Sequence, residues 1–216
     1  MEIRIELPAA KLGIVEADGV EVTPVNPAFG RIVDDVCARK RKKFTVETLA
    51  QTEPVRAVRA MFRAWGMDPS KNRPSSEALL RRVVQGKGLY RVSNVVDIGN
   101  LGSVETGWPY GCYDRSRIGT AVVFRRGAAG ERYERVGKEM WHLEGRPLLA
   151  DADGPFGSPI SDSTRTMVTE STCQVLVVIY APAAGSGEGL NEAMARLSER
   201  LTQFSQARAV RYSISA

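Results

Sequence analysis

Apolar residues recur at helical spacing in four stretches of the chain. This spacing predicts helices over residues 27–43, 53–65, 75–84 and 190–204. In each stretch the apolar positions share one face, and charged residues occupy the others. Ser75 or Ser76 is the expected cap of the third helix. A fifth stretch, residues 94–106, also has helical spacing, although two internal glycines weaken the prediction.

Strand patterns alternate with these helices and dominate the second half of the chain. They predict strands over residues 2–7, 13–22, 120–126, 131–136, 148–152, 173–181 and 210–214. The turn residues 128–130 predict that the strands on either side of them form a hairpin. The longest apolar run, residues 175–183, indicates the most buried strand. The pattern as a whole is typical of an α+β protein.

Composition excludes several classes of protein. The chain has 216 residues, of which 43% are apolar and 25% charged, as in an ordinary globular protein. No apolar run approaches the roughly 18 residues of a membrane span, so we expect no membrane partner. Three distant cysteines argue against a disulfide framework or a zinc knuckle and favour the cytoplasm. With one histidine, we expect neither a metal site nor a cofactor.

Positive charge is concentrated in residues 39–91. This segment carries fourteen basic and four acidic residues, a net charge of +10, whereas the whole chain carries +5. The run at residues 39–43 is typical of the solvated end of a helix, but the wider segment favours contact with phosphates. No DNA-reading motif is present, so DNA is not an expected partner. The candidate phosphate contacts are Lys71, Arg73, Arg81, Arg82 and Lys87. Arg73 has an equal alternative, a structural ion pair with Glu77 or with a carboxylate of the stretch that begins at Ser93.

Two stretches go beyond generic patterning. Residues 69–82 read PSKNRPSSEALLRR, and residues 93–100 read SNVVDIGN and continue to a second segment, residues 107–114. With residues 150–155 and 168–172, they resemble the B3/B4 domain of the phenylalanyl-tRNA synthetase beta subunit and its free-standing relatives. The resemblance covers residues 55–181. It implies one free-standing domain over residues 1–216, with mixed sheets in a sandwich-like core flanked by helices.

The resemblance also implies an activity. In the synthetase this domain hydrolyses the ester of an amino acid attached to the wrong tRNA, and free-standing relatives do so after the tRNA is released. We therefore expect a trans-editing hydrolase whose partner is the acceptor end of a mischarged tRNA. Nothing here resembles the motifs that charge tRNA. A tRNA- or RNA-binding module without catalysis and a domain that binds a free amino acid are the alternatives, and the oligomeric state stays open.

The candidate site follows from the same register. Asn100 matches an Asn in the synthetase's pocket, where it is expected to orient water or the ester carbonyl, and Asp97 is expected on the same helix face. Asn94 is a candidate substrate contact, with capping of the helix as its alternative. For Asp97 the alternative is a structural pair with an arginine. Gly99 and Gly111 stand where the family has Thr and His, which predicts a differently shaped pocket.

A second segment and two aromatic residues complete the candidates. Asp162, with Ser163 and Thr164, lies where the family has an acidic residue that reads the amino acid. A buried carboxylate favours a polar or cationic partner, so we expect a substrate of that kind. Trp108 and Tyr110 are candidates either for stacking on the terminal adenine or for the core.

Overall fold

The computed structural model describes residues 1–24, 26–137, 139–184 and 187–216. Its helices are α1 (Pro27–Lys43), α2 (Val46–Leu49), α3 (Glu53–Ala64), α4 (Ser75–Val84), α5 (Asn94–Thr106) and α6 (Gly187–Ser205). Its strands are β1 (Ile3–Ile5), β2 (Ala10–Asp18), β3 (Tyr110–Asp114), β4 (Val122–Arg126), β5 (Arg132–Glu134), β6 (Met140–His142), β7 (Pro147–Asp151), β8 (Gly154–Gly157), β9 (Gln174–Pro182) and β10 (Ala209–Ser215). Two 3-10 turns are η1 (Arg115–Arg117) and η2 (Thr164–Thr166). None of the helices it describes has the length and apolar character needed to cross a membrane.

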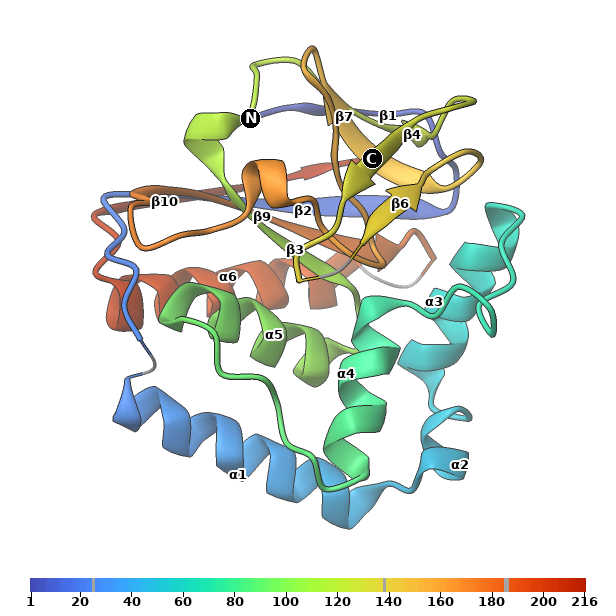
Figure 1. The fold of residues 1–216 in the computed structure, drawn as a ribbon. Helices are drawn as coiled ribbons and strands as arrows, with labels where there is room; N and C mark the ends of the chain where they lie inside the picture. Colours follow the sequence, from blue (N-terminus) through green and yellow to red (C-terminus); the bar gives the residue numbers. More distant parts are fainter. Residues whose placement is uncertain (25, 138, 185–186) are drawn as a thin grey trace.

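Two four-stranded sheets form the core. One has the order β10-β2-β9-β3 and is antiparallel; the other has the order β1-β4-β7-β8, with β1 parallel to β4. Helices α5 and α6 lie below the first sheet, and the second sheet lies above it (Figure 1). This arrangement confirms the predicted α+β fold with mixed sheets and flanking helices.

The central strand β9 explains why the two layers hold together. Its residues Val175, Val177 and Ile179 pack into the core shared with the helices. The alternate residues Leu176, Val178 and Tyr180 pack into the core shared with the second sheet. Because successive side chains of a strand point to opposite faces, a strand apolar at every position suits a sheet covered on both sides.

Several helix predictions are confirmed, and the details show why. Helix α1 starts after Asn26, whose Oδ1 accepts from the backbone N–H of Ala28 at 2.8 Å. Helix α5 runs through both of its glycines and ends at Gly107, which has a φ of +78°. Tertiary packing therefore overrides the weak intrinsic propensity of this segment. No serine caps α4, however: its N-cap is Pro74, which has no side-chain hydrogen bond.

Two strand predictions are wrong. The second strand occupies Ala10–Asp18 rather than residues 13–22, because Gly19, with a φ of +69°, ends it. The predicted hairpin between residues 120–126 and 131–136 does not form. Instead β4 pairs with β1 and β7, and β5 pairs with β6. Long-range pairing, which no local pattern encodes, decides the partner of β4.

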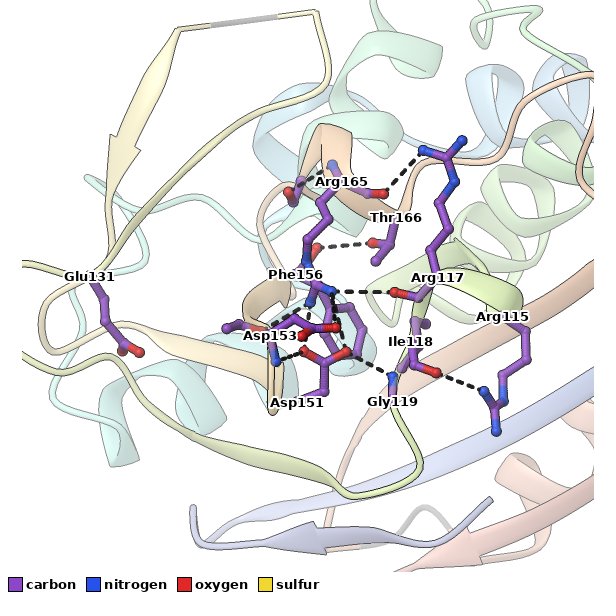
Figure 2. Close-up of polar contacts among 12 residues, drawn as sticks. Arg115, Arg117, Ile118, Gly119, Glu131, Asp151, Asp153, Phe156, Arg165 and Thr166 are labelled. Atoms are coloured by element: carbon purple, nitrogen blue, oxygen red, sulfur yellow. Dashed lines mark hydrogen bonds and ion pairs between the residues drawn. The ribbon is translucent and has the colours of Figure 1, made fainter.

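An arginine clamp fixes the segment that leads from β8 to η2. Figure 2 shows Arg165, whose Nη2 donates to Asp151 Oδ1 at 2.8 Å and to the Gly154 carbonyl at 3.0 Å. The other oxygen of Asp151 accepts from the Gly119 backbone N–H at 2.9 Å. The Asp151 side chain is buried, and its ion pair with Arg165 compensates the loss of water. The clamp thereby holds η2 against the hairpin of β7 and β8.

Candidate functional site

A cleft of about 730 Å³ opens between helices and loops on one side of the molecule. Its wall is formed by α4 and the loop after it, by α5 and β3, and by the loops that follow β5, β8 and η2. The residues that line this cleft include Arg73, Ser75, Leu79, Arg81, Arg82, Lys87, Tyr90, Val92, Val96, Gly99, Asn100, Tyr110, Cys112, Val136, Ile160, Ser161, Asp162 and Met167. The volume suits a small molecule or the end of a larger one.

Helix α5 contributes the residues that the sequence motif singled out. Val96, Gly99 and Asn100 face the cleft, as expected for positions three and four apart on a helix. Gly99 lets α5 approach β3, since a Cβ there would lie 2.4 Å from the sulfur of Cys112. Burial raises the pKa of the Cys112 thiol well above its usual range, which disfavours the reactive thiolate.

The cleft also contains a carboxylate with an unusual environment. Asp162 Oδ1 accepts from the Tyr113 hydroxyl at 2.7 Å and from the Ser158 backbone N–H at 3.3 Å. The Tyr113 oxygen lies 3.0 Å from the Tyr180 hydroxyl, and because Tyr113 gives its proton to Asp162, Tyr180 donates to Tyr113. Burial raises the pKa of Asp162 to about 7, although the hydrogen bond from Tyr113 favours the charged form.

The structure shows which side chain occupies the space beside Gly111. The missing side chain does not enlarge the cleft, because the Tyr113 hydroxyl fills the space: a Cβ on Gly111 would lie 2.0 Å from that oxygen. A Cβ on Gly157 would lie 2.2 Å from the same atom. The two glycines therefore make room for the tyrosine that holds Asp162.

Two of the candidate residues on α5 lie outside the cleft. Asn94 is buried, and its Oδ1 accepts from the backbone N–H groups of Thr23 and Val95 at 3.0 and 2.9 Å. Its amide nitrogen donates to two backbone carbonyls, one of them in α6. Ser93 caps α5 in its place. Asp97, also buried, accepts from the Val92 backbone N–H at 3.0 Å and does not line the cleft beside Asn100.

Three further candidates lie outside the cleft as well. Ser163 is buried and caps η2, accepting from the Arg165 backbone N–H at 3.0 Å. Thr164 makes its contacts with Glu134. Lys71 is exposed in the loop before α4. Within residues 161–164, Ser161 and Asp162 line the cleft, whereas Ser163 and Thr164 do not.

Four of the five predicted phosphate contacts line the cleft, namely Arg73, Arg81, Arg82 and Lys87. Glu77, buried at the start of α4, lies 3.9 Å from the nearest nitrogens of Arg73 and Arg81. The Glu77 carboxylate also accepts two hydrogen bonds from Arg59, from Nη2 at 2.7 Å and from Nε at 2.8 Å. Arg73 therefore lies within ion-pair distance of Glu77. Arg82 and Lys87 form no ion pair within the part of the chain that the structure describes.

The sequence interpretation missed the apolar rim of the cleft. Tyr90 and Val92 are 55% and 61% exposed, and Val136 and Met167 are exposed on other loops around the same opening. These four are separated by up to 77 positions in sequence, in loops with no periodicity that would single them out. The one signal was local: Tyr90 and Val92 are apolar residues in a loop, where polar residues are the norm.

Comparisons with known proteins agree with the motif resemblance. The family model for the B3/4 domain matches residues 57–214. The phenylalanine–tRNA ligase beta subunit of Streptomyces avermitilis is 36% identical over 93 residues, which cover 43% of this chain and 11% of that protein. The corresponding subunit of Symbiobacterium thermophilum is 30% identical over 101 residues, covering 45% and 11%.

A solved structure is also similar. It is an N-terminal fragment of the phenylalanyl-tRNA synthetase beta subunit from Pyrococcus horikoshii, with a TM-score of 0.46 and 15% identity, covering 99% of this chain and 50% of that one. The chain spans about a tenth of the length of the curated relatives that it matches. Because the family model covers most of the sequence, the resemblance is confirmed, and the chain belongs to the B3/4 domain family.

Proposed function

We propose that this protein hydrolyses the ester bond of mischarged aminoacyl-tRNA in trans, with the aminoacyl end of the tRNA seated in the cleft. The observation that carries the proposal is the composition of the cleft. It combines the motif residue Asn100, the carboxylate of Asp162 and four cationic side chains in one cavity. An aminoacylated tRNA end offers the matching groups, namely an ester, an ammonium group and phosphates.

Hydrolysis of this ester requires few catalytic groups from the protein. A water oxygen bonds to the ester carbonyl carbon, the bond from that carbon to the ribose oxygen breaks, and the ribose oxygen takes up a proton. Because the ester is already activated, positioning the water and stabilising the developing oxyanion can supply a large rate gain. The side-chain amide of Asn100 both donates and accepts hydrogen bonds, so it can orient the water or the carbonyl.

Asp162 is assigned to the amino-acid part of the substrate. A carboxyl group whose pKa lies near 7 is easily ionised by a positive partner, because a nearby cation lowers that pKa. The site therefore favours a polar or cationic group and disfavours a purely apolar side chain. Asp97 and Asn94 have no part in this scheme, since both are buried outside the cleft.

A deacylation panel tests the proposal. Transfer RNAs charged with apolar, polar and cationic amino acids are incubated with the protein, and ester loss is compared with a buffer blank. We expect one class to be cleaved selectively and Asn100→Ala to abolish the cleavage. Asn191→Ala is the matched control, because Asn191 is exposed on α6, far in sequence from any cleft residue.

The alternatives give different results in the same experiment. No acceleration with any charged tRNA, together with tRNA binding that weakens steeply with salt, identifies a binding module without catalysis. Salt-insensitive binding of a free amino acid, with no cleavage of any charged tRNA, identifies a small-ligand domain. Either result overturns the proposed hydrolysis.

A further inference from the structure

We infer that Tyr90 and Arg82 form a stacking platform for an unpaired nucleobase at the mouth of the cleft. The inference rests on the proposed function in one respect, because it names the subsite that would receive the 3′-terminal base of the tRNA. It replaces Trp108 and Tyr110 as the stacking candidates. Trp108 packs against the core and does not line the cleft, and the ring of Tyr110 lies against Gly102.

The geometry of the platform is specific. The guanidinium carbon of Arg82 lies 4.0 Å from the centroid of the Tyr90 ring, which is a close cation–π contact. Tyr90 is nevertheless 55% exposed. Arg82 projects from the last turn of α4, which ends at Val84, and therefore comes from a fixed element. An aromatic ring held by an arginine and open to solvent is preorganised for stacking, because little side-chain freedom is left to lose.

The surroundings select the class of ligand. Exposed large apolar side chains are uncommon on this surface, yet Tyr90, Val92, Val136 and Met167 gather around one opening. The same cleft carries four cationic residues and the carboxylate of Asp162. A ligand with a flat apolar face and flanking negative charge complements both features. An unpaired nucleotide has this combination, because every base has a π-face and a phosphate beside it.

Binding of a trinucleotide tests the platform directly. The probe is the RNA trinucleotide CCA, compared with a CCA whose 3′ nucleotide lacks its base, and titrated at fixed ionic strength. Tyr90→Ala is expected to weaken CCA binding by about 5- to 150-fold, the loss of one base–aromatic stack. Tyr90→Phe keeps the ring and should stay within about twofold of the unmodified protein. Tyr212→Ala is the matched control, since Tyr212 is 51% exposed on β10 and is not a cleft residue.

The abasic probe shows whether the base itself makes the contact. It should bind the unmodified protein as weakly as CCA binds Tyr90→Ala, and Tyr90→Ala should weaken it no further. Equal CCA affinity for Tyr90→Ala and the unmodified protein overturns the inference. So does an abasic probe that binds as well as CCA, which would show that the phosphates or the other two bases carry the affinity.

Failure of this inference is distinguishable from failure of the proposed hydrolysis. Tyr90-dependent binding of CCA by a protein that cleaves no charged tRNA supports the platform and overturns the hydrolase. Deacylation whose kcat/KM is unchanged in Tyr90→Ala supports the hydrolase and overturns the platform.

Discussion

Replacing Asp162 with asparagine should change how the stability of this protein depends on pH. The asparagine side chain keeps an oxygen at the position of Oδ1, so the hydrogen bonds from Tyr113 and Ser158 can persist. The substitution removes only the titrating charge. Burial raises the pKa of Asp162 from 3.8 to about 7 in the folded protein. The charged form is therefore less favourable in the folded chain than in the unfolded one.

The sign and the size of the effect follow from linkage. Below pH 3.8 the carboxyl group is protonated in both states and costs nothing. As the pH rises toward 7, the unfolded chain releases this proton while the folded chain keeps it, so the free energy of unfolding falls. The slope is about 1.4 kcal/mol per pH unit, which gives a total loss of at most about 4 kcal/mol by neutral pH. Above the folded pKa the loss levels off.

Urea unfolding of both proteins at constant ionic strength, between pH 4 and 8.5, measures the effect. The difference in free energy of unfolding between Asp162→Asn and the unmodified protein cancels the contributions of the other titrating groups. We expect this difference to grow in favour of Asp162→Asn from pH 4 to about pH 7 and to stay constant at higher pH. Parallel pH profiles would refute the assignment of Asp162 as a buried, destabilised carboxylate.

Three further substitutions test the packing around the cleft. Gly99→Ala should lower the free energy of unfolding by about 1–3 kcal/mol, because the added Cβ meets the Cys112 sulfur. In a protein that already carries Cys112→Ala, the same substitution should leave the stability in thermal unfolding unchanged or raise it. Glu77→Gln should lower the free energy of unfolding in urea by about 1–3 kcal/mol, because the buried carboxylate loses its charged hydrogen bonds to the partly exposed Arg59; an unchanged free energy of unfolding contradicts this. Asn94→Ala should cost about 3 kcal/mol by leaving buried backbone groups unpaired, whereas Asn100→Ala should cost less than about 1 kcal/mol; equal losses would place both in the core.

Much of the fold was predictable because the spacing of apolar residues along the chain indicates helices and strands directly. The start of α1 is fixed by Asn26 and Pro27, and its apolar stripe gives its length. The continuous apolar run of β9 indicated a strand covered on both faces. The motif around Asn100 led to the cleft because α5 carries it as one rigid unit. Val96 and Asn100, four positions apart on that helix, both reach the cleft.

Other features were hidden because no periodic pattern along the chain encodes which atoms a particular side chain contacts. The side chain that faces Gly111 comes from Tyr113, and only the folded sheet shows that its hydroxyl reaches Asp162. The direction of Asp97 was also hidden, because its backbone partner, Val92, lies in an irregular loop. A sequence shows which glycine is small, but not which atom occupies the space beside it.

The sequence by itself determined the α+β class, the helices, the basic segment and the family. Each of these is a property of residues close together along the chain. Only the tertiary structure decided that Arg82, Asn100 and Asp162 share one cleft, and that β4 pairs with β1 and β7. The physical reason is that the packing of the whole core decides which distant segments come together. The local pattern of apolar and polar residues does not specify those partners.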